Sequence, residues 1–216
     1  MARLVVFDLD GTITRGDTLV SYVIGLLRKR PWQLASLVCA APAALDYWRG
    51  RLDRGSLKAR FLQVTLGRYT RTELQAWTAR FVPRLLARGV RSDAVRAIEA
   101  HRREGDVLVL LSASPDLYVP QIAARLGFDQ AICTGLGWTD DHLDGALTTP
   151  NRRDAEKTRC ILELAARHPG LRTVAYANDV ADLDHLRRVD QPLLVCGSRR
   201  ARRAAARAGI PTTCWR

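Results

Sequence analysis

The sequence predicts an α/β protein built on a doubly wound parallel sheet, with a small inserted helical cap. Four short apolar runs, rich in β-branched residues and free of charge, alternate with longer amphipathic segments. This is the pattern of parallel strands that are buried on both faces. The alternation is interrupted over residues 16–89, where helical patterns occur without a convincing strand. We therefore expect residues 1–15 and 90–216 to form the core and residues 16–89 to form the cap.

The predicted strands and helices of the core follow one another in the order that a doubly wound sheet requires. The four apolar runs lie at residues 4–7, 107–111, 173–177 and 192–196. Amphipathic segments predict helices at residues 92–105, 117–128 and 155–168, of which the first begins at a serine and ends at a glycine. Apolar pieces separated by glycines at residues 131–150 predict a strand followed by a hairpin.

The cap is predicted to be helical at residues 17–30, 56–67 and 70–89. Between them, residues 31–48 contain no Lys or Arg, carry aromatic residues at both ends and are flanked by RKR and RGR. Their uninterrupted apolar part is too short to cross a bilayer, which needs roughly 20 residues, and Pro42 would kink a helix there. Two interpretations of residues 31–48 are possible: a buried helix of the cap, or a segment that contacts a membrane interface.

Composition narrows the classes of function. The chain has 216 residues and a formal net charge of +12, and residues 16–89 hold 13 Lys and Arg against 4 Asp and Glu. Such a surface attracts phosphate esters and anionic lipid alike. The arginine run at residues 199–207 has no interleaved aromatic residues, so we expect no nucleic-acid partner. The chain opens without a secretion signal and its five cysteines are scattered, which predicts a cytoplasmic protein without zinc or disulfides.

Two carboxylates end the first predicted strand. Asp8 and Asp10 are two residues apart in VVFDLDGT, so their side chains point the same way in an extended chain. They would repel each other unless a cation lay between them or one of them carried a proton, and both arrangements serve phosphoryl transfer. Gly11 and Thr12 follow in a tight turn that can present backbone N–H groups to a phosphate.

Three further elements fall at the ends of the later strands. Ser112, followed by Ala113, ends the second strand, and a hydroxyl there can donate to a phosphoryl oxygen. Lys157 begins a predicted helix and can neutralise a nucleophile and a transferring group. The third strand runs into a cluster of oxygen ligands that suit Mg²⁺, namely Asn178, Asp179 and Asp182.

Together these elements resemble the haloacid dehalogenase-like (HAD) superfamily, in its phosphoserine-phosphatase-like subclass. DLDGT, LLSAS, Lys157 and YANDVADL are similar to its four motifs in order. The resemblance implies a Rossmann-like core and a phosphomonoester hydrolase that uses Mg²⁺ and an aspartyl-phosphate intermediate. It implies that Asp8 attacks phosphorus and that Asp10 transfers protons.

The resemblance also implies roles for the other motif residues. Thr12 and Ser112 would hold the phosphoryl group, with Gly11 and Ala113 beside them, and Lys157 would neutralise it. Mg²⁺ would be bound by Asp8, by the Asp10 carbonyl and by the fourth motif. The family usually has Asp where this chain has Asn178, which predicts weaker metal binding unless Asp179 compensates.

The substrate stays open between alternatives. Asp17 and Arg60 resemble the amine-binding acid and the carboxylate-binding arginine of phosphoserine phosphatases, which implies a small phosphorylated metabolite. The cap is also similar to that of bacterial phosphatidylglycerophosphate phosphatases, which implies an anionic lipid phosphate and a peripheral place at the inner membrane face. A third alternative is a catalytically weak HAD-like binding protein.

Overall fold

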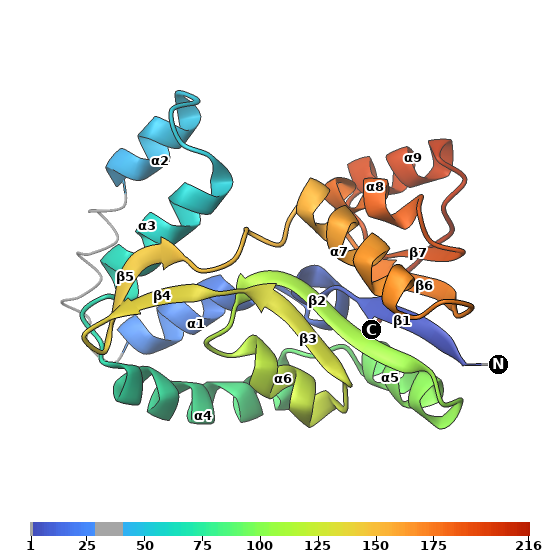
Figure 1. Cartoon of the computed structure of the whole chain (residues 1–216), viewed down its shortest axis with the longest axis horizontal. Coiled ribbons are helices and arrows are strands. Elements are labelled where there is room, and N and C mark those ends of the chain that lie inside the picture. Colours follow the sequence, from blue (N-terminus) through green and yellow to red (C-terminus); the bar gives the residue numbers. More distant parts are fainter. Residues whose placement is uncertain (1, 29–40) are drawn as a thin grey trace.

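The core of the computed structural model, which describes residues 2–28 and 41–216, is a six-stranded parallel sheet in the order β3–β2–β1–β6–β7–β8 (Figure 1). The strands are β1 (Arg3–Phe7), β2 (Val107–Pro115), β3 (Gln130–Thr134), β6 (Arg172–Ala177), β7 (Gln191–Val195) and β8 (Thr212–Thr213). The chain builds outward from β1 in one direction and then, from β6, in the other. This is the doubly wound order whose reversal point lies between β1 and β6, so the predicted fold class is confirmed.

Helices cover both faces of the sheet. α5 (Ser92–Arg103) and α6 (Val119–Leu126) pack on one face, and α7 (Ala155–Arg167), α8 (Leu183–Leu186) and α9 (Arg199–Arg207) pack on the other. The side chains of β1 are buried on both faces of the sheet, which suits its central position. Val5 and Phe7 belong to the apolar cluster on the side of α5 and α6, whereas Leu4 and Val6 belong to the cluster on the side of α7, α8 and α9. A strand that is buried on both sides needs such an uninterrupted apolar run.

The inserted helices are α1 (Thr18–Leu27), α2 (Ala41–Trp48), α3 (Arg54–Leu66) and α4 (Arg71–Arg88). The hairpin of β4 (Leu136–Thr139) and β5 (His142–Leu147) extends to the same end of the molecule and packs against α3 (Figure 1). There the Gln63 side chain donates to the carbonyl of Asp144 at 2.9 Å. A segment from the second half of the chain therefore completes the surroundings of the inserted helices.

The two connections between the core and the inserted helices run side by side. Thr14 and Val90 form an antiparallel bridge, the Arg15 amide donates to the Gly89 carbonyl at 2.8 Å, and the Arg91 amide donates to Ile13 at 2.9 Å. The chain thus leaves and re-enters the core at one place. The division into a core and a cap at residues 16–89 stays a prediction.

The apolar segment predicted in the cap is described only in part. Of the apolar segment 31–48, residues 31–40 lie outside the described residues. Within the described ranges, no helix combines the length and the apolar character needed to cross a membrane.

Candidate active site

Asp8 lies immediately after β1, at the carboxyl edge of the sheet. Its backbone amide donates to the Tyr176 carbonyl of β6 at 2.9 Å, which fixes it beside the reversal point of the strand order. Its carboxylate is buried and accepts two hydrogen bonds, from Lys157 Nζ to Oδ1 at 2.7 Å and from Thr12 Oγ1 to Oδ2 at 3.0 Å. The side chain is therefore held on both oxygens.

Lys157, near the start of α7, pairs with two carboxylates at once. Its ammonium lies 2.7 Å from Asp8 Oδ1 and 2.8 Å from Asp182 Oδ1, and all three side chains are buried. Burial alone would lower the pKa of Lys157, but the two carboxylates outweigh it and hold that pKa above its ordinary value. Burial raises the pKa of Asp8 to about 6, against the lowering effect of Lys157. Lys157 is thus a permanent charge at this site.

Asp10 has a different environment from Asp8. Its two oxygens accept from the Thr18 amide and from Ser114 Oγ, both at 2.6 Å. Thr18 begins α1, and its hydroxyl contacts Ser114 Oγ at 3.2 Å and Tyr118 OH at 3.1 Å. Burial raises the pKa of Asp10. Burial thus opposes ionisation of this carboxyl group, whereas its hydrogen-bond donors, which are neutral, orient it and lower its pKa.

Asn178 packs on the turn that follows β1. Gly11 has a φ of +79°, and a Cβ placed on it would lie 2.1 Å from Asn178 Nδ2. Asn178 Oδ1 lies 3.4 Å from Thr12 Oγ1. A glycine is required here both by the backbone conformation and by this close approach.

Asp179 and Asp182 form a reciprocal cap on the turn after β6. The Asp179 amide donates to Asp182 Oδ2 at 3.2 Å, and Asp179 Oδ1 accepts from the Ala181 amide at 2.9 Å. Lys157 binds the other oxygen of Asp182. Burial alone would raise the pKa of Asp182. Its pairing with Lys157 outweighs this effect and holds that pKa below its ordinary value.

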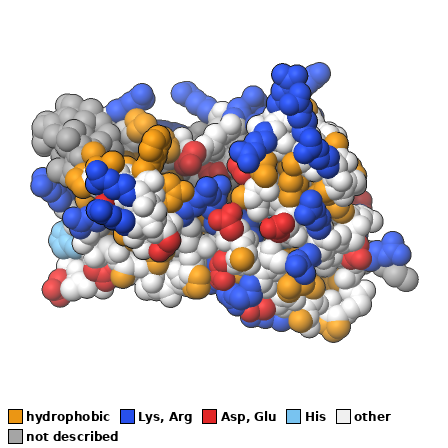
Figure 2. Space-filling view, turned by 90° about the horizontal axis from the view of Figure 1, so that it is seen from above, with side chains coloured by type: hydrophobic (Ala, Val, Ile, Leu, Met, Phe, Trp, Pro, Cys, Tyr) orange, Lys and Arg blue, Asp and Glu red, His pale blue; other side chains and the backbone are white. Residues whose placement is uncertain are grey.

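These groups surround a cavity of about 320 Å³. Most residues predicted for the site line it: Asp8, Asp10, Gly11, Asp17, Ala113, Lys157, Asn178, Asp179 and Asp182. Thr12 does not line the cavity itself, but it donates a hydrogen bond to Asp8, which does. Seen from above, acidic side chains gather near the middle of this face, with Lys and Arg side chains around them (Figure 2).

Three residues predicted to bind substrate have other surroundings. Asp17 lines the cavity but also caps α1, accepting from the Val20 amide at 2.9 Å. Ser112 is fully buried, and its hydroxyl oxygen accepts from the Ser114 amide at 3.0 Å. Arg60 lines a neighbouring groove between α3 and the end of β5, where it donates to Gln63 Oε1 at 2.7 Å. The structure does not place Arg60 with the other residues.

Sequence reasoning missed three residues that bring polar side chains to the cavity lining: Lys58, Ser114 and Arg153. Ser114 could have been found by the two-residue period of a strand, counted from Ser112. Lys58 could have been found by residue usage, because only three of the 34 Lys and Arg residues are lysines. We see no sequence signal for Arg153.

The donor set around Asp8 fits a hard divalent cation. It consists of carboxylate and amide oxygens without sulfur or imidazole, which is the preference of Mg²⁺. Gly11 leaves the space through which Asn178 enters this set. The residues that would hold Mg²⁺ are Asp8, the Asp10 carbonyl and the side chains after β6.

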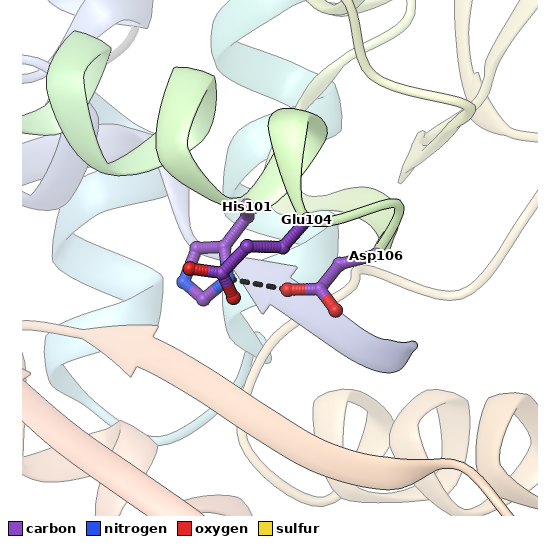
Figure 3. Close-up of side chains that lie close together, drawn as sticks. All are labelled: His101, Glu104 and Asp106. Carbon is purple, nitrogen blue, oxygen red and sulfur yellow. Dashed lines mark hydrogen bonds and ion pairs between the residues drawn. The ribbon is translucent and has the colours of Figure 1, made fainter. Parts of the chain in front are cut away.

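A second group of metal-type ligands in the described ranges lies away from this cavity: His101, Glu104 and Asp106 (Figure 3). His101 Nδ1 lies 2.7 Å from Asp106 Oδ2. The Arg3 guanidinium contacts all three side chains, including Asp106 Oδ2 at 2.7 Å and His101 Nδ1 at 3.2 Å. A cation from the protein itself thus already pairs with both carboxylates of the group, and this contact ties β1 to the segment before β2.

Comparisons with known proteins identify the family of the chain. Residues 5–187 match the haloacid dehalogenase-like hydrolase family. The Protein CicA of Caulobacter vibrioides (strain NA1000 / CB15N) is 33% identical over 194 residues, which cover 87% of this chain and 83% of that protein.

Solved structures share the fold. A protein of unknown function from Bordetella pertussis Tohama I has a TM-score of 0.84 at 23% identity, with 98% of each chain covered. A phosphoserine phosphatase solved as a phospho-aspartyl intermediate analogue has a TM-score of 0.69 at 16% identity, with 99% of this chain and 92% of that chain covered.

Proposed function

The chain belongs to the haloacid dehalogenase-like hydrolases, and on that premise we propose that it is a Mg²⁺-dependent phosphomonoesterase acting through a phosphorylated Asp8. The observation that carries the proposal is the contrast between two neighbouring carboxyl groups. Asp8 is paired with a permanent cation, whereas Asp10 is held by neutral donors. The similarity in fold to a phosphoserine phosphatase solved as a phospho-aspartyl intermediate analogue supports the same assignment.

In the first half of the reaction, an Asp8 oxygen attacks phosphorus, the bond from phosphorus to the leaving oxygen breaks, and Asp10 gives its proton to that oxygen. The raised pKa of Asp10 supports this role, because the group must enter the reaction protonated. In the second half, Asp10 takes a proton from water, the water oxygen attacks phosphorus, and Asp8 is released with orthophosphate. Atoms and charges return to their starting state.

Lys157 and the oxygen ligands supply the electrostatic part of this mechanism. Lys157 stabilises the charge on Asp8 and on the transferring group. Thr12 orients the second Asp8 oxygen through its 3.0 Å hydrogen bond. Bound Mg²⁺ would neutralise negative charge on the phosphoryl oxygens and on Asp8. The proposed substrate class is a small phosphorylated metabolite.

A second candidate substrate is an anionic lipid phosphate, reached from a membrane surface. The observation that favours it is the exposure of Trp48 (88%) and Leu45 (49%) on α2, next to the exposed cations Arg49 and Arg51. Apolar and cationic side chains that lie together suit an anionic bilayer surface. This candidate would place the protein at the periphery of a membrane.

The proposed function is tested with 4-nitrophenyl phosphate, with Mg²⁺ and with EDTA. We expect turnover that requires the metal. A protein that binds phosphate but shows no turnover under either condition would contradict the proposal and leave the reading of a weak HAD-like binding protein.

A further inference from the structure

The cavity holds two cations that the proposed reaction does not use. Of its three basic residues, Lys157 is engaged by Asp8 and Asp182. The other two, Lys58 and Arg153, come from α3 and from the segment before α7. They face the cavity from different parts of the chain.

Lys58 is a half-buried ammonium without a carboxylate partner among the described residues. It donates to the Ala113 carbonyl at 2.6 Å and to Asn151 Oδ1, and an ammonium has three donors. Burial lowers the pKa of Lys58 to about 8. A cation that is partly removed from water with no carboxylate in direct contact is costly, so an anion that contacts it would stabilise it.

Arg153 also lacks a close anionic partner among the described residues. Its Nε is buried and, in the described part of the chain, has no hydrogen-bond acceptor. Its ion pair with the exposed Asp154 is long, at 4.0 Å. The positive charge of Arg153 also contributes to lowering the pKa of Lys58, so the two cations are close enough to repel each other. An anion between them would remove this repulsion.

The position of Lys58 relative to the carboxylates indicates which end of a substrate would lie there. The carboxylates that act most on Lys58 are those of Asp10 and Asp17. In the proposed reaction Asp10 protonates the leaving oxygen, so Lys58 lies on the leaving-group side of the cavity. The phosphoryl group would lie on the other side, above Asp8.

We infer that Lys58 and Arg153 form a second anion-binding subsite, which binds an acidic group on the leaving group of the substrate. This inference rests on the proposed function, and it narrows the substrate class to phosphomonoesters that carry a second acidic group, either a carboxylate or another phosphate. Arg60, for which the carboxylate-binding role is expected from the sequence, lies in the neighbouring groove.

Binding to the Asp8→Asn protein, measured by calorimetry, tests the subsite without turnover. Phosphoserine and phosphoethanolamine differ only by a carboxylate, and 1,3-propanediol bisphosphate and propyl phosphate differ by a phosphate. We expect the acidic member of one pair to bind at least about tenfold more tightly, which corresponds to about 1.4 kcal/mol. Adding Lys58→Met or Arg153→Met should reduce that preference to about twofold or less, since each removes one charge-assisted hydrogen bond.

The control is Arg84→Met, which removes an exposed arginine of α4 outside the cavity and should keep the preference. Lys58→Gln, which retains a donor for the Ala113 carbonyl, should also lose it, and a thermal melt of each variant confirms folding. Equal affinity within both pairs would overturn the inference. So would a preference that survives Lys58→Met and Arg153→Met, or one that disappears only in Arg60→Met. Turnover of 4-nitrophenyl phosphate by the unaltered protein tests the proposed function independently of all these outcomes.

Discussion

Lys157 Nζ lies 2.7 Å from Asp8 Oδ1, and this contact joins the start of α7 to the end of β1 across 149 residues of chain. Both side chains are buried. The pair brings a cation to the proposed nucleophile before any substrate or metal binds, so its two members should affect activity and stability in different ways.

Asp8→Asn should abolish turnover, because an amide cannot attack phosphorus as a carboxylate does. We expect the rate with 4-nitrophenyl phosphate to fall below about a thousandth of that of the unaltered protein, the scale of loss that follows removal of a nucleophile. The matched control is Asp140→Asn, an exposed position in the β4–β5 turn with a φ of +47°, which Asn tolerates. Near-normal Mg²⁺-dependent activity in Asp8→Asn would rule out the mechanism.

Lys157→Met should destabilise the fold as well as the site. It leaves Asp8 and Asp182 buried without their shared cation, and removing one partner of a buried pair costs about 3–5 kcal/mol. Urea unfolding in EDTA measures the loss. The double variant Lys157→Met/Asp182→Asn should regain part of it, because one uncompensated charge is then removed. A loss below about 1 kcal/mol in Lys157→Met would show that the pair contributes little to stability.

Asn178→Asp should lower the Mg²⁺ concentration needed for half-maximal activity. A carboxylate attracts a hard cation more strongly than an amide oxygen does, and Gly11 already gives this side chain its place in the site. Calorimetric titration of the protein with Mn²⁺ provides a readout that does not depend on turnover. If neither the Mg²⁺ requirement nor the Mn²⁺ affinity changes, Asn178 is not a ligand and Asp179 or Asp182 becomes the better assignment.

The sequence was sufficient for the central sheet because β1, β2, β6 and β7 are apolar runs buried on both faces. β8 was missed because two residues, Thr212 and Thr213, carry no periodicity of their own and pair only through β7. For α9 the sequence shows only a run of arginines. Its helical face is formed by Ala201 and Ala205, which are buried but too small to stand out among arginines.

The residues of the site also fall into those that the sequence could predict and those that it could not. Residues within one or two positions of a strand end could be predicted, since parallel strands bring their carboxyl ends to one edge. Lys58 and Arg60 show the limit of that reasoning. They are two residues apart on α3, and the sequence resemblance favours Arg60, yet the packing of α3 brings Lys58 into the cavity and leaves Arg60 in the neighbouring groove. Only the tertiary structure distinguishes two faces of one helix.

His185 should make stability depend on pH. It is buried, its Nδ1 has no hydrogen-bond partner among residues 2–28 and 41–216, and burial lowers its pKa to about 4. The unfolded chain binds a proton near pH 6.5 that the folded protein does not bind, so stability falls as pH decreases from about 6.5 towards 4. His185→Gln removes this loss, which amounts to about 2 kcal/mol between pH 7.5 and 5.

Urea unfolding of both proteins at pH 7.5 and 5, in EDTA, measures the difference. The raised pKa of Asp8 acts in the opposite direction, but it is present in both proteins and cancels in the comparison. An equal pH dependence in the two proteins would mean that His185 titrates normally in the folded state.

If the substrate is a lipid phosphate, the surface around α2 should bind anionic vesicles. Residues 16–89 carry 13 Lys and Arg against 4 Asp and Glu, and each cation near an anionic surface contributes about 1 kcal/mol. Burial of Trp48 and Leu45 would add to this attraction. Sedimentation with phosphatidylglycerol-rich and with neutral vesicles, at low and at physiological salt, should show binding to the anionic vesicles that weakens as salt screens the charges.

Leu45→Ser and Trp48→Ser should weaken this binding, because they remove the apolar contribution while leaving the charges in place. Leu162→Ser is the matched control, since Leu162 is a comparably exposed leucine on α7, at 47% against 49% for Leu45, but lies on the core. If the unaltered protein fails to bind either kind of vesicle at low salt, or if Leu162→Ser weakens binding as much as Leu45→Ser does, the surface around α2 has no role at a membrane. The substrate would then be a soluble phosphate ester, since the cavity beside Asp8 would have to be reached from solution.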